Sequence, residues 1–221
     1  YGAELVNAKG DITVKSDAVR EVLDYAQRLV KLLPKDAVSY DDASNNRALI
    51  SGQSALIWNP SSAWAVAKRD NRQVAEDSWT FTAPAGPKGR FVPHVLFFWG
   101  IWKFSQNKTA AKDLIDYLMQ REQVEARCNV VEGYDIPPFD SMLDFKVWEN
   151  VEPPKGTVYN YPVRPQHKGV VHIAALPAPP EIAVQIYNQG TMSTMMAKLL
   201  SGQSINDVIA WAQNELEGFV G

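Results

Sequence analysis

The sequence predicts an α/β fold, because segments with helical periodicity alternate with short apolar segments rich in branched and aromatic residues. The chain has 221 residues, of which 46% are hydrophobic and 21% charged. That composition is typical of a globular protein with enough apolar residues for one large core or two smaller ones. The net charge is -3 and long Lys/Arg runs are absent, which disfavours nucleic acid as a partner.

Helical periodicity dominates the N-terminal part of the chain. Apolar residues recur at helical spacing over residues 15–33, where Ser16 can act as N-cap and Pro34 ends the pattern. A second, shorter helix is expected over residues 41–50, before Gly52. We therefore expect two helices before the first strand.

Three apolar segments have the composition of buried strands: residues 54–58, 78–83 and 95–102. A helix is expected between the first two, because Asn59, Pro60 and the following serines form a helix start. This helix is predicted to run to about Arg69. Residues 84–89 are predicted to form a loop, since they contain two prolines and two glycines.

The C-terminal half predicts mainly helices, over residues 109–119, 121–130 and 179–200, the last interrupted near Gly190. Ser204 and Asp207 then have the spacing of a capping box, which predicts the start of a final helix. Residues 144–164 are rich in proline and aromatic residues, and we leave them as irregular structure.

Cys128 is the single cysteine, so an intramolecular disulfide and a CxxC metal site are both excluded. We interpret Cys128 as a small buried hydrophobic residue. The sequence holds no signal peptide and no apolar run long enough to span a bilayer. Because the opening residues Tyr1 to Leu5 are typical of the middle of a domain, we expect the chain to be a fragment.

Three groups of motifs occur in a fixed order along the chain. Residues 47–58 read RALISGQSALIW, and residues 81–118 contain PAGPKG, WGI, SQNK and a helix ending in DYL. Residues 200–204 read LSGQS and precede the last helix. In this order the motifs resemble the family 1 extracellular solute-binding proteins of ABC importers, the group that includes maltose-binding and other sugar-binding proteins.

The resemblance implies the C-terminal half of a periplasmic binding protein type II-like fold, in which a ligand binds between two lobes. It implies that residues 1–90 are part of the second lobe and residues 91–145 return to the first lobe. Residues 146–221 would contain the crossover and the C-terminal helices of the second lobe. The implied location is periplasmic or otherwise extracytoplasmic, and the implied partner proteins are the permease subunits of the importer. A dimer formed through a surface exposed by truncation is a further possibility.

The first group of ligand-binding candidates lies where the predicted strand 54–58 meets a helix: Trp58, Asn59, Ser61 and Trp64. Ligands of open α/β sheets bind at such junctions. Aromatic rings can cover the C–H faces of a sugar, while polar groups bind its hydroxyls. The alternative is that Trp58 ends a buried strand and Trp64 packs beneath the helix.

Two further groups complete the candidate site. His94, Phe98 and Trp99 lie on or beside predicted strand 95–102, which by resemblance crosses between the lobes past the ligand. Tyr134 lies in the loop over residues 133–138, and a loop residue can reach a cleft. The alternatives are a structural histidine, a strand face that belongs to the core, and an ordinary surface turn.

The expected function is capture of a sugar, polyol or similar small polar solute and its delivery to an ABC permease, without catalysis, cofactor or metal. A carbohydrate-active enzyme of glycoside hydrolase type is the alternative, and it would need two carboxylates across a scissile bond. The acidic residues lie in no motif that fixes such a pair, and GxSxG, HExxH and P-loop motifs are absent. A protein-interaction module is the third alternative.

Overall fold

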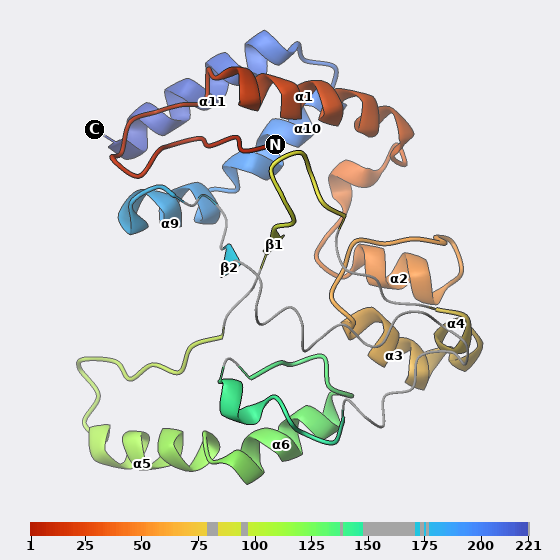
Figure 1. Cartoon of the computed structure of the whole chain (residues 1–221), viewed down its shortest axis with the longest axis vertical. Helices are drawn as coiled ribbons and strands as arrows, with labels where there is room; N and C mark the ends of the chain where they lie inside the picture. The colour runs from red at the N-terminus through yellow and green to blue at the C-terminus, as the bar shows by residue number, and fades with distance from the viewer. Residues whose placement is uncertain are drawn as a thin grey trace. The chain divides into compact units, whose positions relative to one another are not determined.

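The computed structural model describes residues 1–78, 84–93, 97–137, 139–147, 171–172, 175 and 177–220. The chain divides into two compact units, each built from segments distant in sequence (Figure 1). Unit 1 comprises Tyr1–Tyr40, Ala83–Val95 and Val170–Gly221. Unit 2 comprises Asp41–Thr82 and Leu96–Gly169. The assignment of residues 1–90, 91–145 and 146–221 to lobes stays a prediction.

Helix α1 of unit 1 spans Asp17–Leu29 and confirms the first predicted helix. Ser16 is its N-cap, and the Ser16 hydroxyl accepts a hydrogen bond from the Val19 backbone N–H at 3.4 Å. A 3-10 turn over Val30–Leu32 follows, and Leu33 then adopts an extended conformation. The residue before a proline is driven out of the helical region, so Pro34 sets this end of the helix. A second 3-10 turn covers Ala37–Ser39.

Three C-terminal helices complete unit 1: α9 (Pro180–Asn188), α10 (Thr191–Leu200) and α11 (Ile205–Val220). Gly190 separates α9 from α10 with a left-handed φ of 62°, which confirms the predicted interruption. Ser204 caps α11, because its hydroxyl accepts a hydrogen bond from the Asp207 N–H at 3.2 Å. The same hydroxyl donates to the Asp207 carboxylate at 2.6 Å.

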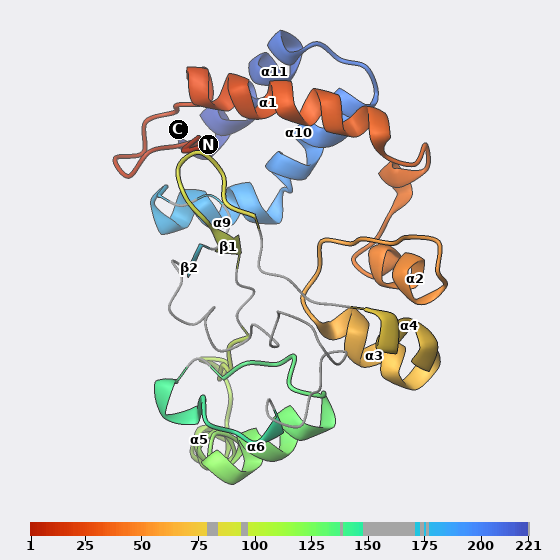
Figure 2. The same cartoon turned by 45° about the vertical axis from the view of Figure 1, so that its right-hand side comes forward.

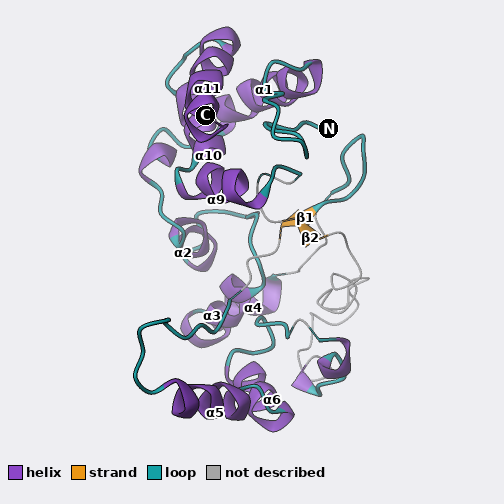
Figure 3. Ribbon diagram, turned by 90° about the vertical axis from the view of Figure 1, so that its left-hand side faces the viewer, coloured by secondary structure: helices purple, strands orange, loops and turns teal. Residues whose placement is uncertain are grey.

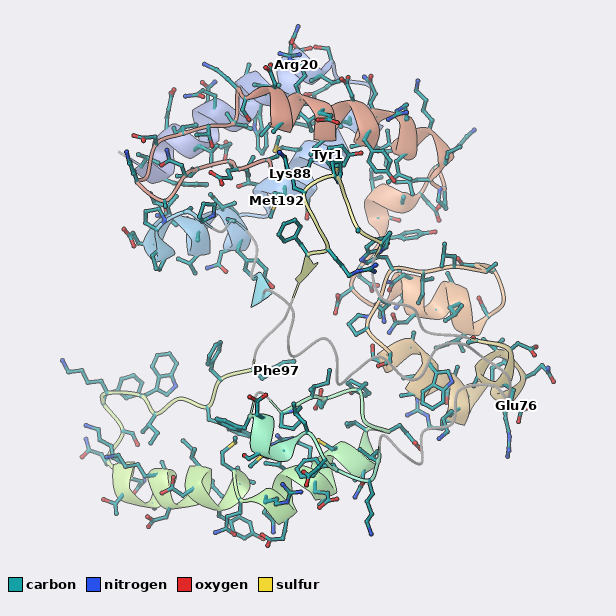
Figure 4. All side chains as sticks on the ribbon, viewed as in Figure 1. Tyr1, Arg20, Glu76, Lys88, Phe97 and Met192 are labelled. Carbon is teal, nitrogen blue, oxygen red and sulfur yellow. The ribbon has the colours of Figure 1, made fainter. Side chains whose placement is uncertain are left out.

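The core of unit 1 lies between α1 and the three C-terminal helices, and α1 runs beside α10 and α11 in Figures 1 and 2. The largest fully buried side chains of this core include Leu23, Ile186, Val208 and Leu216. Arg20 of α1, labelled in Figure 4, also donates a hydrogen bond to the Asn206 side chain of α11 at 2.9 Å. Burial of apolar area on this interface is the main stabilising contribution to the unit.

The strands that the structure describes are short. β1 (Val92–Pro93) and β2 (Val171–His172) form a parallel pair, shown in orange in Figure 3, in which Val92 is opposite Val171. The described part of the chain is therefore rich in helix and contains one parallel strand pair. This bears out the α/β expectation only in that coarse form.

Unit 2 contains five α-helices in its described residues: α2 (Ser44–Ile50), α3 (Ser62–Asp70), α4 (Arg72–Asp77), α5 (Lys108–Leu118) and α6 (Arg121–Val130). A 3-10 turn over Asp140–Met142 follows α6. Helix α4 has no counterpart among the predicted elements. Its N-cap is Asn71, whose side chain accepts from the Val74 N–H at 3.4 Å and donates to the Ile50 carbonyl at 2.8 Å.

The core of unit 2 joins α3 and α4 to α6 and the segment after it. Its buried members are Trp64, Ala67, Ala75, Val124, Cys128, Phe145 and Val147. Cys128 is buried there, as the sequence predicted. Its thiol donates to the Asp135 carbonyl oxygen at 3.2 Å, and burial raises the pKa of Cys128 to about 11.

Residues 54–58 do not form the predicted buried strand. The Ser54 N–H donates to the Ala48 carbonyl at 3.0 Å, and the Trp58 carbonyl accepts from the Asn45 side chain at 3.2 Å. The backbone at both ends of this segment is thus bonded to α2. Leu56 and Trp58 are 80% and 69% exposed, so the segment is not buried either.

The predicted strand over residues 95–102 is also wrong for its described part, residues 97–102. These residues form a loop with exposed aromatic side chains. A strand exists only when a neighbour takes up its backbone hydrogen bonds, and no strand of the described chain lies beside this segment. Of the predicted strand 78–83, all but Ser78 lies outside the described residues, as does most of the irregular stretch 144–164.

Among the helices that the structure describes, none has both the length and the apolar character that crossing a bilayer requires.

Shortening a buried side chain of unit 1 should destabilise it strongly. We expect Leu216→Ala to lower the free energy of unfolding by about 2–5 kcal/mol, because it leaves a cavity in the core between α1 and α11. Urea unfolding followed by circular dichroism measures this. Leu32→Ala is the matched control, because Leu32 is exposed and its truncation should change stability by less than about 0.5 kcal/mol. Equal effects of the two substitutions would contradict the packing described.

The Cys128 thiol should resist alkylation in the folded protein. The folded pKa of about 11 lies above the reference value of 9.0, so the thiol stays protonated at pH 8. Iodoacetamide labelling followed by mass spectrometry should therefore be slow in buffer and fast in urea. Stability from burying the neutral thiol is complete below pH 9 and is lost as pH rises toward 11. Rapid labelling of the native protein would contradict the burial.

Candidate functional site

The connection between α2 and α3 holds Trp58 in a fixed place with its indole ring largely exposed. One side-chain amide organises this connection. Asn45 Nδ2 donates to the Trp58 carbonyl oxygen at 3.2 Å and to Asn59 Oδ1 at 3.0 Å. The Asn45 Oδ1 accepts from the Asn46 N–H at 2.8 Å. The backbone at Trp58 is therefore anchored to α2 while the ring is open to a ligand.

Asn59 uses its own amide to join this connection to the start of α3. Asn59 Nδ2 donates to the Pro60 carbonyl at 2.8 Å and to the Ser62 hydroxyl at 3.1 Å. Both amide hydrogens are occupied within the protein, and Oδ1 keeps one acceptor site beyond its bond from Asn45. The geometry therefore gives Asn59 a positioning role at the junction, and at most an acceptor role toward a ligand.

Ser61 and Trp64 lie at and after the start of α3. The Ser61 carbonyl accepts the hydrogen bond from the Ala65 N–H at 3.0 Å, and Ser61 is the N-cap residue. Trp64 is 8% exposed, and its Nε1–H donates to the Ala75 carbonyl at 3.2 Å. The Lys68 ammonium lies 4.9 Å from the Trp64 ring centroid. Trp64 thus occupies the core, the packing beneath the helix that the sequence allowed as its alternative reading.

Phe98 and Trp99 lie together in the loop before α5, and both rings are exposed. His94, which belongs to the same predicted group, lies outside the described residues. The structure thus shows two aromatic surfaces in unit 2, one at Trp58 and one over residues 97–99. A binding role for each of these residues stays a prediction.

Tyr134 is half-buried in the loop after α6, and that loop is fastened at several points. The Gly133 N–H donates to the Cys128 carbonyl at 2.8 Å, and the Tyr134 N–H donates to the Val131 carbonyl at 3.3 Å. Glu132 and Gly133 both have left-handed φ values, 54° and 74°. The loop is therefore held in one tight turn and presents Tyr134 and Asp135 from a defined backbone.

Two connections in this region were not found from the sequence. Asn45 anchors Trp58, and Lys68 forms an ion pair with Glu132 at 2.7 Å that joins α3 to the Tyr134 loop. Asn45 lies in an unremarkable polar run, and Lys68 and Glu132 are far apart in sequence. The one sequence signal for the anchoring of Trp58 was the position of Asn45 on the helix that precedes Trp58. The ion pair had no sequence signal.

The chemistry of the junction is that of a neutral polar surface beside an aromatic ring. Trp58, Asn59, Ser61 and Ser62 carry no charge, and among the described residues no group of three or more His, Cys, Asp or Glu side chains could hold a metal ion. An exposed indole can stack on an apolar ligand face, and adjacent backbone and hydroxyl groups can bind hydroxyls. This arrangement suits an uncharged polar solute.

Comparison with known proteins identifies the family. Residues 2–154 match the family described as bacterial extracellular solute-binding protein. The matched region contains all the ligand-binding candidates from Trp58 to Tyr134. No curated protein and no solved structure gives a significant match. The match covers well over half of the 221 residues and confirms the family resemblance, so the chain belongs to the bacterial extracellular solute-binding proteins.

Proposed function

We propose that this chain captures a sugar, a polyol or a similar small polar solute and delivers it to the permease of an ABC importer. The observation that carries the proposal is the exposed Trp58 ring, on a backbone that the Asn45 amide anchors, in a chain that belongs to a solute-binding family. The family functions outside the cytoplasm, where such capture takes place.

The Trp58 junction favours a sugar over an ionic solute. A pyranose has C–H faces that stack on a flat ring and a rim of hydroxyls that need hydrogen-bond partners. Trp58 offers the ring, and the Ser62 hydroxyl and the remaining Asn59 acceptor site belong to the same hydrogen-bonded connection. Because the Trp58 backbone is already anchored, little backbone entropy is lost when the solute binds.

The proposal extends to a two-lobed receptor that closes on its solute. In this mechanism the solute first contacts one lobe and then favours the closed form by contacting the other. Phe98, Trp99 and Tyr134 are proposed to provide further contacts to the solute, and Trp64 to act as the core support of α3. Closure would create the form that the permease recognises. We propose no catalytic step.

Solute binding should raise the thermal stability of the chain, because a ligand that binds only the folded state stabilises it. At a solute concentration about 100 times Kd the stabilisation is about 2.7 kcal/mol, which raises Tm by roughly 5–10 °C. A thermal-shift screen against monosaccharides, oligosaccharides and polyols measures this. Mass spectrometry of the same samples should find the solute unchanged.

Trp58→Ala should weaken binding of the solute found in that screen by about tenfold or more, because it removes a stacking face. Isothermal titration calorimetry measures the change. Trp102→Ala is the matched control, since Trp102 is a similarly exposed tryptophan outside the α2–α3 connection, and it should leave Kd unchanged. A solute that binds both variants equally well would sink the Trp58 site. Conversion of the solute to product would favour the glycoside hydrolase alternative.

A further inference from the structure

Helix α6 ends in a turn where a glutamate takes the place that glycine normally occupies. The Glu132 N–H donates to the Asn129 carbonyl at 3.2 Å, and the Gly133 N–H donates to the Cys128 carbonyl at 2.8 Å. These two bonds define a Schellman motif, in which the first residue beyond the helix cap has a left-handed backbone and is usually glycine. Here that residue is Glu132, with a φ of 54°. A side chain in this conformation costs free energy, so the sequence departs from the locally preferred residue.

The Glu132 carboxylate has a partner far away in the sequence, which gives a reason for this departure. Lys68 Nζ of α3 lies 2.7 Å from Glu132 Oε2. The same ammonium lies 4.9 Å from the ring centroid of Trp64, whose indole is buried and bonded to the Ala75 carbonyl. Lys68 therefore projects from a well-supported helix. Residues that break a local rule are expected where tertiary contacts or function require them, and glycine could not form this ion pair.

The ion pair determines how the loop after α6 is attached to α3. Tyr134 follows Glu132 by two residues, and its N–H donates to the Val131 carbonyl at 3.3 Å within the same turn. The connection that carries Trp58 leads directly into the start of α3. Helix α3 thus joins two of the proposed solute contacts, Trp58 through the chain itself and Tyr134 through the side chain of Lys68.

We propose that Lys68 and Glu132 are positioning residues of the solute site, whose ion pair fastens the Tyr134 loop to α3 and so sets the affinity for the solute without contacting it. This inference rests on the proposed function. The side chains of Lys68 and Glu132 are 38% and 41% exposed, so dissolved salt screens their attraction. Binding of an uncharged sugar should therefore weaken as ionic strength rises, although the sugar has no charge to screen. Between about 0.01 M and 1 M NaCl, Kd should rise about two- to fivefold.

Hydrogen exchange measured by NMR tests the positioning without any solute. Lys68→Met nearly keeps the length of the side chain and removes its charge, so the Gly133 and Tyr134 amides should exchange about two- to fivefold faster. Lys68→Arg keeps the charge and should preserve the exchange rates. Arg72→Met is the matched control, because the pair that Arg72 forms with Glu76 at 2.8 Å lies within α4, and this variant should leave both amides unchanged.

Isothermal titration calorimetry tests the link to binding, with each uncharged sugar or polyol that raises Tm in the thermal-shift panel as probe. Lys68→Met should raise Kd about two- to fivefold and abolish its dependence on ionic strength. Glu132→Gly should raise Kd by the same factor, while the free energy of unfolding stays the same or increases, because glycine suits the left-handed backbone. A residue with a purely structural role would lower stability and affinity together.

Three results would overturn the inference. The first is unchanged exchange of the Gly133 and Tyr134 amides in Lys68→Met, which would show that the ion pair does not hold the loop. The second is faster exchange with an unchanged Kd, which would separate the loop from the solute. The third is a salt dependence of Kd that persists in Lys68→Met.

The proposed function is tested separately, because it stands or falls with the effect of Trp58→Ala on binding. If Trp58→Ala weakens binding and the Lys68 variants do not, the proposed function stands and this inference fails. If no sugar or polyol of the panel binds, the proposed function fails and the claim about affinity fails with it. The exchange rates then still show whether the ion pair holds the loop.

Discussion

The buried indole of Trp64 is the interaction on which unit 2 depends. Its ring fills the core between α3, α4 and α6, and its Nε1–H satisfies the Ala75 carbonyl in α4. An indole N–H without a partner in this core would be costly, so the hydrogen bond fixes the ring as well as satisfying it. Lys68 stands over the same ring and pairs with Glu132, which extends the support to the loop of Tyr134.

The exposed Trp58 gains its position from this support and from the neighbouring amides. Burial of Trp64 holds α3, Asn59 joins the start of α3 to the connection, and Asn45 joins the connection to α2. Two tryptophans six positions apart thus have opposite environments. One stabilises the helix, and the other is left free on a backbone that the first has helped to immobilise.

The sequence predicted the features that depend on neighbouring residues. Ser16 and Ser204 cap helices, Pro34 and Gly190 end them, and Cys128 is buried, because each follows from local backbone chemistry or side-chain character. The family was also predicted from the order of the motifs. Residues 54–58 and 97–102 were wrongly predicted as strands, since composition shows that a segment can pair but not that a partner is present.

The candidate site shows the same limit. Aromatic and polar residues near Trp58 could be chosen from their chemistry, but the sequence could not show which tryptophan is buried. That distinction depends on the contacts of Trp64 with α4 and α6. Helix α6 is distant from α3 in the sequence, and α4 is separated from α3 by a turn. The ion pair between Lys68 and Glu132 is likewise a property of the folded chain alone.

The discontinuous make-up of unit 1 has a consequence for biosynthesis. Helix α1 is synthesised before α9, α10 and α11, against which its apolar face packs. The core of unit 1 therefore stays incomplete until α11 has been made, and α1 carries an uncovered apolar face until then.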